Sequence, residues 1–141
     1  MFISVFFYLF LISLSVSDLK FGIVPNKILL IFFSVIFCMM LSGDISAISI
    51  NLLSASFVFF ILVLVKHFTK GIGAGDIKLL FVTTFYSGFM DSLIAITVAC
   101  CFGIAACLML RFGKTVSSRI SFAPFITVGY LSVDFLGKKV L

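Results

Sequence analysis

Six stretches of the chain carry no charged residue, and they limit what it can fold into more than any other feature. A helix that crosses a bilayer needs about 20 mostly apolar residues. The chain is 63% hydrophobic and only 11% charged, whereas soluble domains carry about 25% charged residues. The sequence therefore predicts an all-α, polytopic membrane protein that forms a single domain over residues 1–141. The uncharged runs are 1–17, 28–43, 45–65, 79–90, 92–110 and 120–133.

These runs predict about six transmembrane helices, of which the fourth is unusually short. The second and sixth runs become long enough if their helices begin near Asn26 and extend past Phe135. The fourth run follows the glycine-rich segment 71–78, so we expect its helix to start at the Gly-x-Gly-Asp sequence. Irregular backbone at membrane depth is tolerated only where protein buries it or water reaches it. The pattern therefore predicts a hydrated cavity near Asp76.

The basic residues predict the orientation in the membrane. Eight of the ten Lys and Arg residues fall in alternate connections between the uncharged runs. By the positive-inside rule these connections face the cytoplasm and both chain ends lie outside. The net charge of +5 is then explained by this asymmetry and by attraction to anionic lipid headgroups. No basic cluster interleaved with aromatic residues indicates nucleic-acid binding. The eight residues are Lys20, Lys27, Lys66, Lys70, Lys78, Arg111, Lys114 and Arg119.

Two aspartates stand beside uncharged runs on the predicted cytoplasmic side. Asp18 follows the first run, and Asp76 precedes the fourth. An ionised carboxylate at a bilayer boundary is costly, so such residues are functional candidates by default. Paired carboxylates can hydrolyse a peptide: an ionised one deprotonates water, and a protonated one polarises the scissile carbonyl. Repulsion between close like charges separates their pKa values and so allows both roles.

The glycines before Asp76 favour a site that a peptide backbone can approach. Gly73 and Gly75 permit unusual backbone angles and leave room for an extended substrate. The structural alternative is a simple turn in which Asp76 caps the following helix. Asp18 likewise has a structural alternative, a helix-end charge paired with Lys20.

The remaining reactive residues predict no metal ion and no cofactor. The chain has a single histidine, His67, and no glutamate. Its four cysteines lie inside uncharged runs without a Cys-x-x-Cys pair, which indicates packing residues and neither zinc nor redox chemistry. The cysteines are Cys38, Cys100, Cys101 and Cys107.

Small residues recur every four positions in the fifth run. Such a strip lies on one helix face and lets a neighbouring helix backbone approach closely. We expect it to pack against another helix. The strip consists of Ala95, Ala99, Gly103 and Cys107.

Three short segments, taken in order, resemble the signatures of the type IV prepilin peptidases, membrane aspartyl proteases of the Gly-x-Gly-Asp kind. The first is Asp18 with the Val24-Pro25-Asn26 sequence that follows it. The second is the Gly-x-Gly-Asp-x-Lys sequence at 73–78, and the third is the apolar Phe-Ala-Pro-Phe stretch at 122–125. Together they span nearly the whole chain.

The resemblance implies an aspartic endopeptidase in a bacterial plasma membrane, with its active site toward the cytoplasm. It assigns the two catalytic roles to Asp18 and Asp76, and it points to Gly73, Gly75 and Lys78 as substrate-binding residues. The implied substrate is a prepilin or pilin-like secretion subunit, cut between its basic leader and its apolar helix. Longer family members carry paired Cys-x-x-Cys motifs linked to N-methylation, which this sequence lacks. It resembles the short, peptidase-only form.

Three other functions are compatible with the residues alone. A related Gly-x-Gly-Asp protease could act on other membrane-protein stems. Intramembrane carboxylates also relay protons in small proton-coupled carriers, although the sequence has no inverted repeat of the kind common in carriers. A structural assembly subunit would leave both aspartates without a role.

Overall fold

The computed structural model describes residues 2–21, 25–41, 45–69, 73–112 and 122–140, and within these ranges the chain is helical. This confirms the predicted all-α class. The short fourth helix begins one residue after Gly73, where the Gly-x-Gly-Asp sequence predicts it. The six helices are α1 (Phe2–Phe21), α2 (Asn26–Met40), α3 (Ile45–Thr69), α4 (Ala74–Ser87), α5 (Phe89–Phe112) and α6 (Ala123–Val140).

Three of the described helices are long and apolar enough to cross a membrane, and they are those of the first, third and fifth uncharged runs. The candidate spans are Ser4–Phe21, Ser46–Phe68 and Phe89–Met109. Two shorter apolar helices, Asn26–Met40 and Ala123–Phe135, accompany them. Helix α2 begins at Asn26 and α6 extends past Phe135, as predicted, and α1 continues past Asp18 to Phe21. The described part of each of these two apolar helices is nevertheless shorter than the three candidate spans, so the count of about six transmembrane helices stays a prediction.

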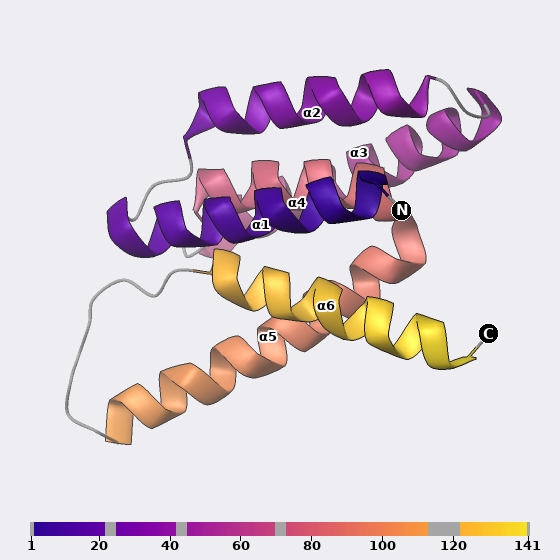
Figure 1. The fold of residues 1–141 in the computed structure, drawn as a ribbon. Coiled ribbons are helices and arrows are strands. Elements are labelled where there is room, and N and C mark those ends of the chain that lie inside the picture. Colours follow the sequence, from indigo (N-terminus) through magenta and orange to yellow (C-terminus); the bar gives the residue numbers. More distant parts are fainter. Residues whose placement is uncertain (1, 22–24, 42–44, 70–72, 113–121, 141) are drawn as a thin grey trace.

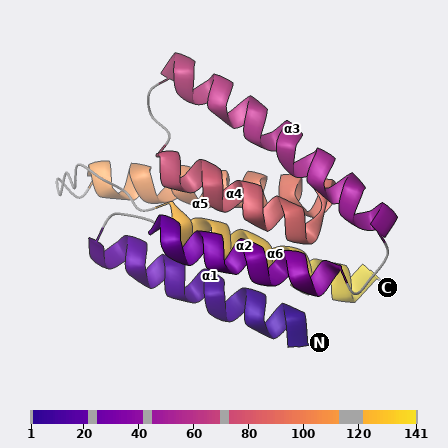
Figure 2. The ribbon, with the colours of Figure 1, turned by 90° about the horizontal axis from the view of Figure 1, so that it is seen from above.

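Helix α4 lies at the centre of the bundle. Figure 1 shows it behind α1 and between the levels of α2 and α6, and Figure 2 shows α3 on its other side. Half of its residues are buried, and the ring of Phe7 in α1 stacks on Tyr86 with centroids 4.2 Å apart. Because protein surrounds it, α4 need not match the thickness of a bilayer. Its buried residues are Ile77, Leu79, Leu80, Val82, Thr83, Thr84 and Phe85.

The boundary between the fourth and fifth helices differs from the prediction. The uncharged run continues to Met90, but α4 ends at Ser87 and α5 already begins at Phe89. Gly88 forms the break, with a φ of 83° and its amide hydrogen-bonded to the Thr84 carbonyl at 2.9 Å. A positive φ is easily adopted by glycine. Charge was therefore a poor guide to this boundary, because the turn chemistry of Gly88 sets it.

The strip of small residues on α5 packs against α6, as predicted, over most of its length. Ala95, Ala99 and Gly103 are buried, whereas Cys107 is exposed. On the facing helix, Gly129 lies so close to the Ala95 carbonyl that a Cβ atom has no room there. The two helices therefore touch through backbone at this crossing.

Candidate active site

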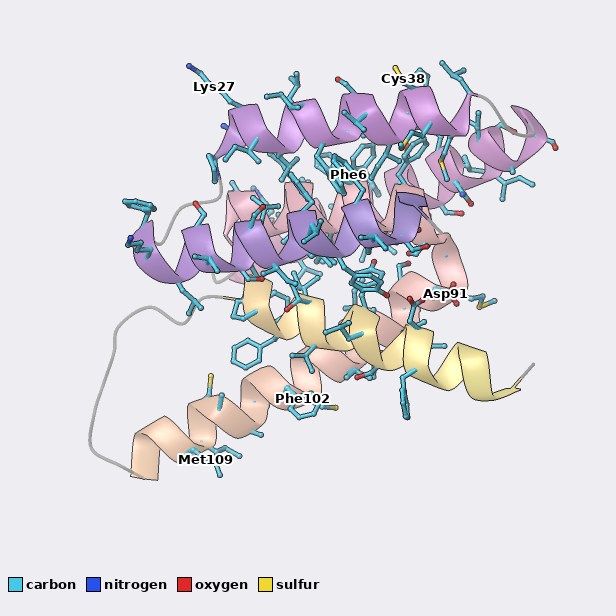
Figure 3. All side chains as sticks on the ribbon, in the orientation of Figure 1. Phe6, Lys27, Cys38, Asp91, Phe102 and Met109 are labelled. Carbon is cyan, nitrogen blue, oxygen red and sulfur yellow. The ribbon has the colours of Figure 1, made fainter. Side chains whose placement is uncertain are left out.

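The two aspartates lie at the same end of the bundle. At this end, on the left of Figure 1, α1 and α3 finish and α2, α4 and α6 begin. Asp18 belongs to the closing turns of α1 and Asp76 to the first turn of α4. Figure 3 labels Lys27 at this end and Asp91 at the opposite end. Lys27 and Asp91 thus lie at the ends that the sequence predicts, whereas Asp44, Lys70, Lys114 and Arg119 lie outside the described residues.

Asp18, in α1, is buried against the start of α6. Its side chain is 7% exposed, and its Oδ2 accepts a hydrogen bond from the backbone amide of Ala123 at 3.4 Å. The amides of Phe125 and Ile126 both bond to the Phe122 carbonyl, and Pro124 has no amide hydrogen. The Ala123 amide therefore donates its hydrogen bond to Asp18. This amide lies at the N-terminus of α6, which is the positive end of the helix dipole.

Asp76 is the third residue of α4 and does not cap it. The N-cap position belongs to Gly73, whose φ of −65° and ψ of 140° are open to any residue. What Gly73 supplies is space, because a Cβ atom there would lie 3.0 Å from Oδ2 of Asp76. The expectation that Gly73 uses unusual backbone angles is therefore wrong for this residue. Gly75 lies within the first turn of α4.

Burial and the nearby charge of Asp18 raise the pKa of Asp76 from 3.8 to about 6. Burial is the larger cause, because a carboxylate loses solvation when apolar groups replace water. The smaller cause is repulsion by the Asp18 carboxylate, which acts only where the carboxyl groups of Asp18 and Asp76 lie near each other. The Asp76 carboxyl group therefore keeps its proton in weakly acidic solution.

An apolar cavity of about 410 Å³ opens beside Asp76. Helix α5, which slants away from the rest of the bundle in Figure 1, forms one wall of this cavity. Among the described residues, Asp76 is the only charged one that lines it, and the other walls come from α3, α4, α5 and α6. The lining residues besides Asp76 are Leu62, Leu80, Ile96, Cys100, Gly103, Ile104, Cys107, Phe122 and Phe125.

Lys78 joins two of the signature segments. Its Nζ donates a hydrogen bond to Oδ1 of Asn26 at 3.0 Å, which ties the start of α4 to the start of α2. The Ala123–Asp18 bond joins the first segment to the third in the same way. Residues from all three segments therefore meet at one end of the bundle.

The cysteines differ from the prediction that they fill the interior. All four are exposed on the surface of the bundle, and Cys100 and Cys107 also line the cavity beside Asp76. Their apolar character suits a lipid-facing surface equally well. Among the described residues, no three His, Cys, Asp or Glu side chains come together in a group that could hold a metal ion.

These features define a helical membrane protein with a pair of aspartates at one end of its bundle and an apolar cavity against one of them. The chain belongs to the type IV leader peptidase family, whose model matches residues 5–108. The resemblance drawn from the three segments is thereby confirmed, and it places the chain in a family of aspartic-type peptidases.

A curated relative matches over the full chain. The prepilin leader peptidase/N-methyltransferase of Bacillus subtilis (strain 168) is 30% identical over 146 residues, covering 100% of this chain and 58% of the relative. The chain therefore spans less than two thirds of that protein's length. No solved structure matches the chain.

The contact between Gly73 and Asp76 yields a first prediction. In Gly73→Ala the new methyl group lies 3.0 Å from Oδ2 of Asp76, so the carboxyl group must shift by a few tenths of an ångström. If Asp76 takes part in peptide cleavage, as proposed below, this shift should lower the rate several-fold, since a misplacement of about 1 Å can cost about 100-fold. Ala47→Ser is the control, because it also adds one heavy atom, to an exposed residue near the start of α3 at the opposite end of the bundle. Equal activity in the two variants would contradict the proposed packing of Asp76.

Proposed function

We propose that the protein is an aspartic endopeptidase that removes the basic leader from type IV prepilins or pilin-like secretion subunits. The observation that carries the proposal is the pair of aspartates in unequal surroundings, with Asp18 beside the Ala123 amide and Asp76 half-buried against an apolar cavity. Membership of the leader peptidase family supports the same reaction.

In the proposed reaction, Asp18 is the base and Asp76 is the acid. Asp18 takes a proton from a water molecule, and the oxygen of that water attacks the scissile carbonyl carbon. Asp76 donates its proton to the carbonyl oxygen and so stabilises the tetrahedral intermediate. When the C–N bond breaks, the proton on Asp18 passes to the leaving amine and Asp76 recovers its own. The pair returns to its starting protonation.

The proposed substrate position follows from the charge and the shape of this end of the bundle. The apolar stem of the substrate enters the cavity beside Asp76, while the leader remains in the aqueous phase. Gly73 and Gly75 leave the approach to Asp76 free of bulky side chains. The hydrogen bond from Lys78 to Asn26 holds the start of α4 next to the start of α2. By the positive-inside rule this end faces the cytoplasm of a bacterial plasma membrane.

A purified cleavage assay tests this proposal. The full chain in detergent is mixed with a prepilin, and leader loss is followed by mass spectrometry. We expect one cut between the leader and the apolar helix. Cleavage of unrelated membrane stems at equal rates would favour a broader protease. Proton-coupled flux through liposomes without any cleavage would favour a carrier.

The raised pKa of Asp76 predicts how cleavage depends on pH. Asp76 must be protonated to donate to the carbonyl oxygen, and its pKa is about 6. We therefore expect kcat/KM, which reports the free enzyme, to fall as pH rises through about 6 and to approach a tenfold loss per pH unit above it. Initial rates from pH 4.5 to 8.5 measure this. A profile that stays flat up to pH 8.5 would contradict the acid role of Asp76.

A further inference from the structure

A second cavity lies at the same end of the bundle, between the end of α3 and the start of α4. Its volume is about 710 Å³, and its basic lining consists of Lys66, His67 and Lys78. No acidic residue is among the described residues that line it. Lys66 and His67 belong to the last turn of α3, close to the end of the candidate span Ser46–Phe68.

The rest of the cavity wall is apolar and extends along α3. Phe59 and Val63 precede Lys66 on that helix, and Ile77 faces them from α4. With a rise of 1.5 Å per residue, Phe59 lies about 10 Å from Lys66 along the helix axis. The cavity is therefore basic at the aqueous end and apolar toward the middle of the bilayer. Lys78 gives one hydrogen bond to Asn26, and an ammonium group has three donors.

We propose that this cavity binds an anionic glycerophospholipid. Lys66 and Lys78 contact its phosphate, and an acyl chain lies along Phe59, Val63 and Ile77. A soluble phosphate compound would match the lysines but not the apolar wall. The basic leader of a substrate is excluded because its charge has the same sign as the lining. A lipid satisfies both parts of the wall, at the depth where headgroups occur.

The bound lipid has a consequence that rests on the proposed peptidase function. Lys78 is two residues from Asp76, so the basic rim that repels a basic leader lies beside the reacting groups. An anionic headgroup in the cavity neutralises this rim.

Lipid binding can be measured directly, without substrate. The full chain in zwitterionic phosphatidylcholine micelles is titrated with spin-labelled phosphatidylglycerol, and the immobilised fraction is recorded. One Lys near an anionic surface contributes about 1 kcal/mol, so Lys66→Gln should weaken binding about fivefold. Lys20→Gln, an exposed Lys on α1 at the same end, removes the same charge away from the cavity and should leave binding within about twofold of the wild type.

Three outcomes would overturn the proposal. Equal weakening in Lys66→Gln and Lys20→Gln would mean a diffuse surface charge. Equal immobilisation of labelled phosphatidylcholine would mean no preference for an anionic headgroup. Displacement of the label by millimolar inorganic phosphate would mean a site for a free anion. Because no cleavage is measured, these outcomes are independent of whether the peptidase proposal holds.

Discussion

Asp76→Asn will lose leader cleavage and remain folded, and Asp18→Asn will behave in the same way. An asparagine at position 18 cannot deprotonate water, and one at position 76 cannot supply an acidic proton. General acid–base catalysis by one side chain contributes about 10²–10⁴-fold, so each variant should fall at least about 100-fold. Initial rates of leader release with a purified prepilin measure this loss.

Asp91→Asn is the matched control for this experiment. Asp91 also lies in the first turn of a helix, α5, but it is exposed at the opposite end of the bundle. The same chemical change at position 91 should leave cleavage near the wild-type rate. Activity that persists in either Asp18→Asn or Asp76→Asn would contradict the paired mechanism. Equal losses in all three variants would mean a general effect of lost charge.

The stability of Asp76→Asn separates lost chemistry from lost folding. The folded protein holds the Asp76 proton more tightly than the unfolded chain, because the pKa of Asp76 rises from 3.8 to about 6. This group therefore makes the wild type less stable as pH rises from about 4 to about 6, and the loss persists at higher pH. Asparagine does not ionise, so at pH 7.5 the variant should unfold at the same or a higher temperature than the wild type.

Gly129→Ala will destabilise the protein, although alanine is the better helix former. In the interior of a helix, replacing glycine by alanine ordinarily gains up to about 1 kcal/mol. At position 129, however, the added methyl group overlaps the backbone of Ala95, so α5 and α6 must separate. Forcing extra volume into a packed contact typically costs about 1–3 kcal/mol. Thermal unfolding of the purified variant in detergent measures the net loss.

Gly129→Ala should also impair cleavage, because both helices serve the candidate site. The start of α6 carries the Ala123 amide that contacts Asp18, and α5 forms one wall of the cavity beside Asp76. For the unfolding measurement, Gly103→Ala provides the control on the facing helix, since its added Cβ makes only ordinary contacts with Phe122. A Gly129→Ala protein as stable as the Gly103→Ala protein would show that the helices are not in backbone contact there.

The sequence predicted the helices and the shared end of the aspartates because both follow from strong signals. Uncharged runs locate apolar helices. Two helices, the second and the third, lie between the end of the first run and the start of the fourth. That alternation brings Asp18 and Asp76 to one end without any knowledge of packing. The early start of α2 at Asn26 also follows from sequence, because Pro25 cannot continue a helix from before it.

The features that the sequence did not predict depend on backbone atoms. The Ala123 amide that contacts Asp18 has no side-chain signature. Gly88 ends α4 inside an uncharged run, where the Ser87-Gly88 pair was the available signal of a turn. Gly129 is distinguished from other glycines only by the carbonyl of Ala95 on another helix. Each depends on contacts between segments far apart in the chain.

The most direct test is an experimental structure of the full chain in a lipid nanodisc, in which the shortest distance between carboxyl oxygens of Asp18 and Asp76 is measured. One water molecule bridging two hydrogen bonds of about 2.7 Å spans up to about 5.5 Å, and we expect the two groups to lie within that reach. Carboxyl groups separated by more than about 10 Å, or found at opposite ends of the bundle, would contradict the paired mechanism.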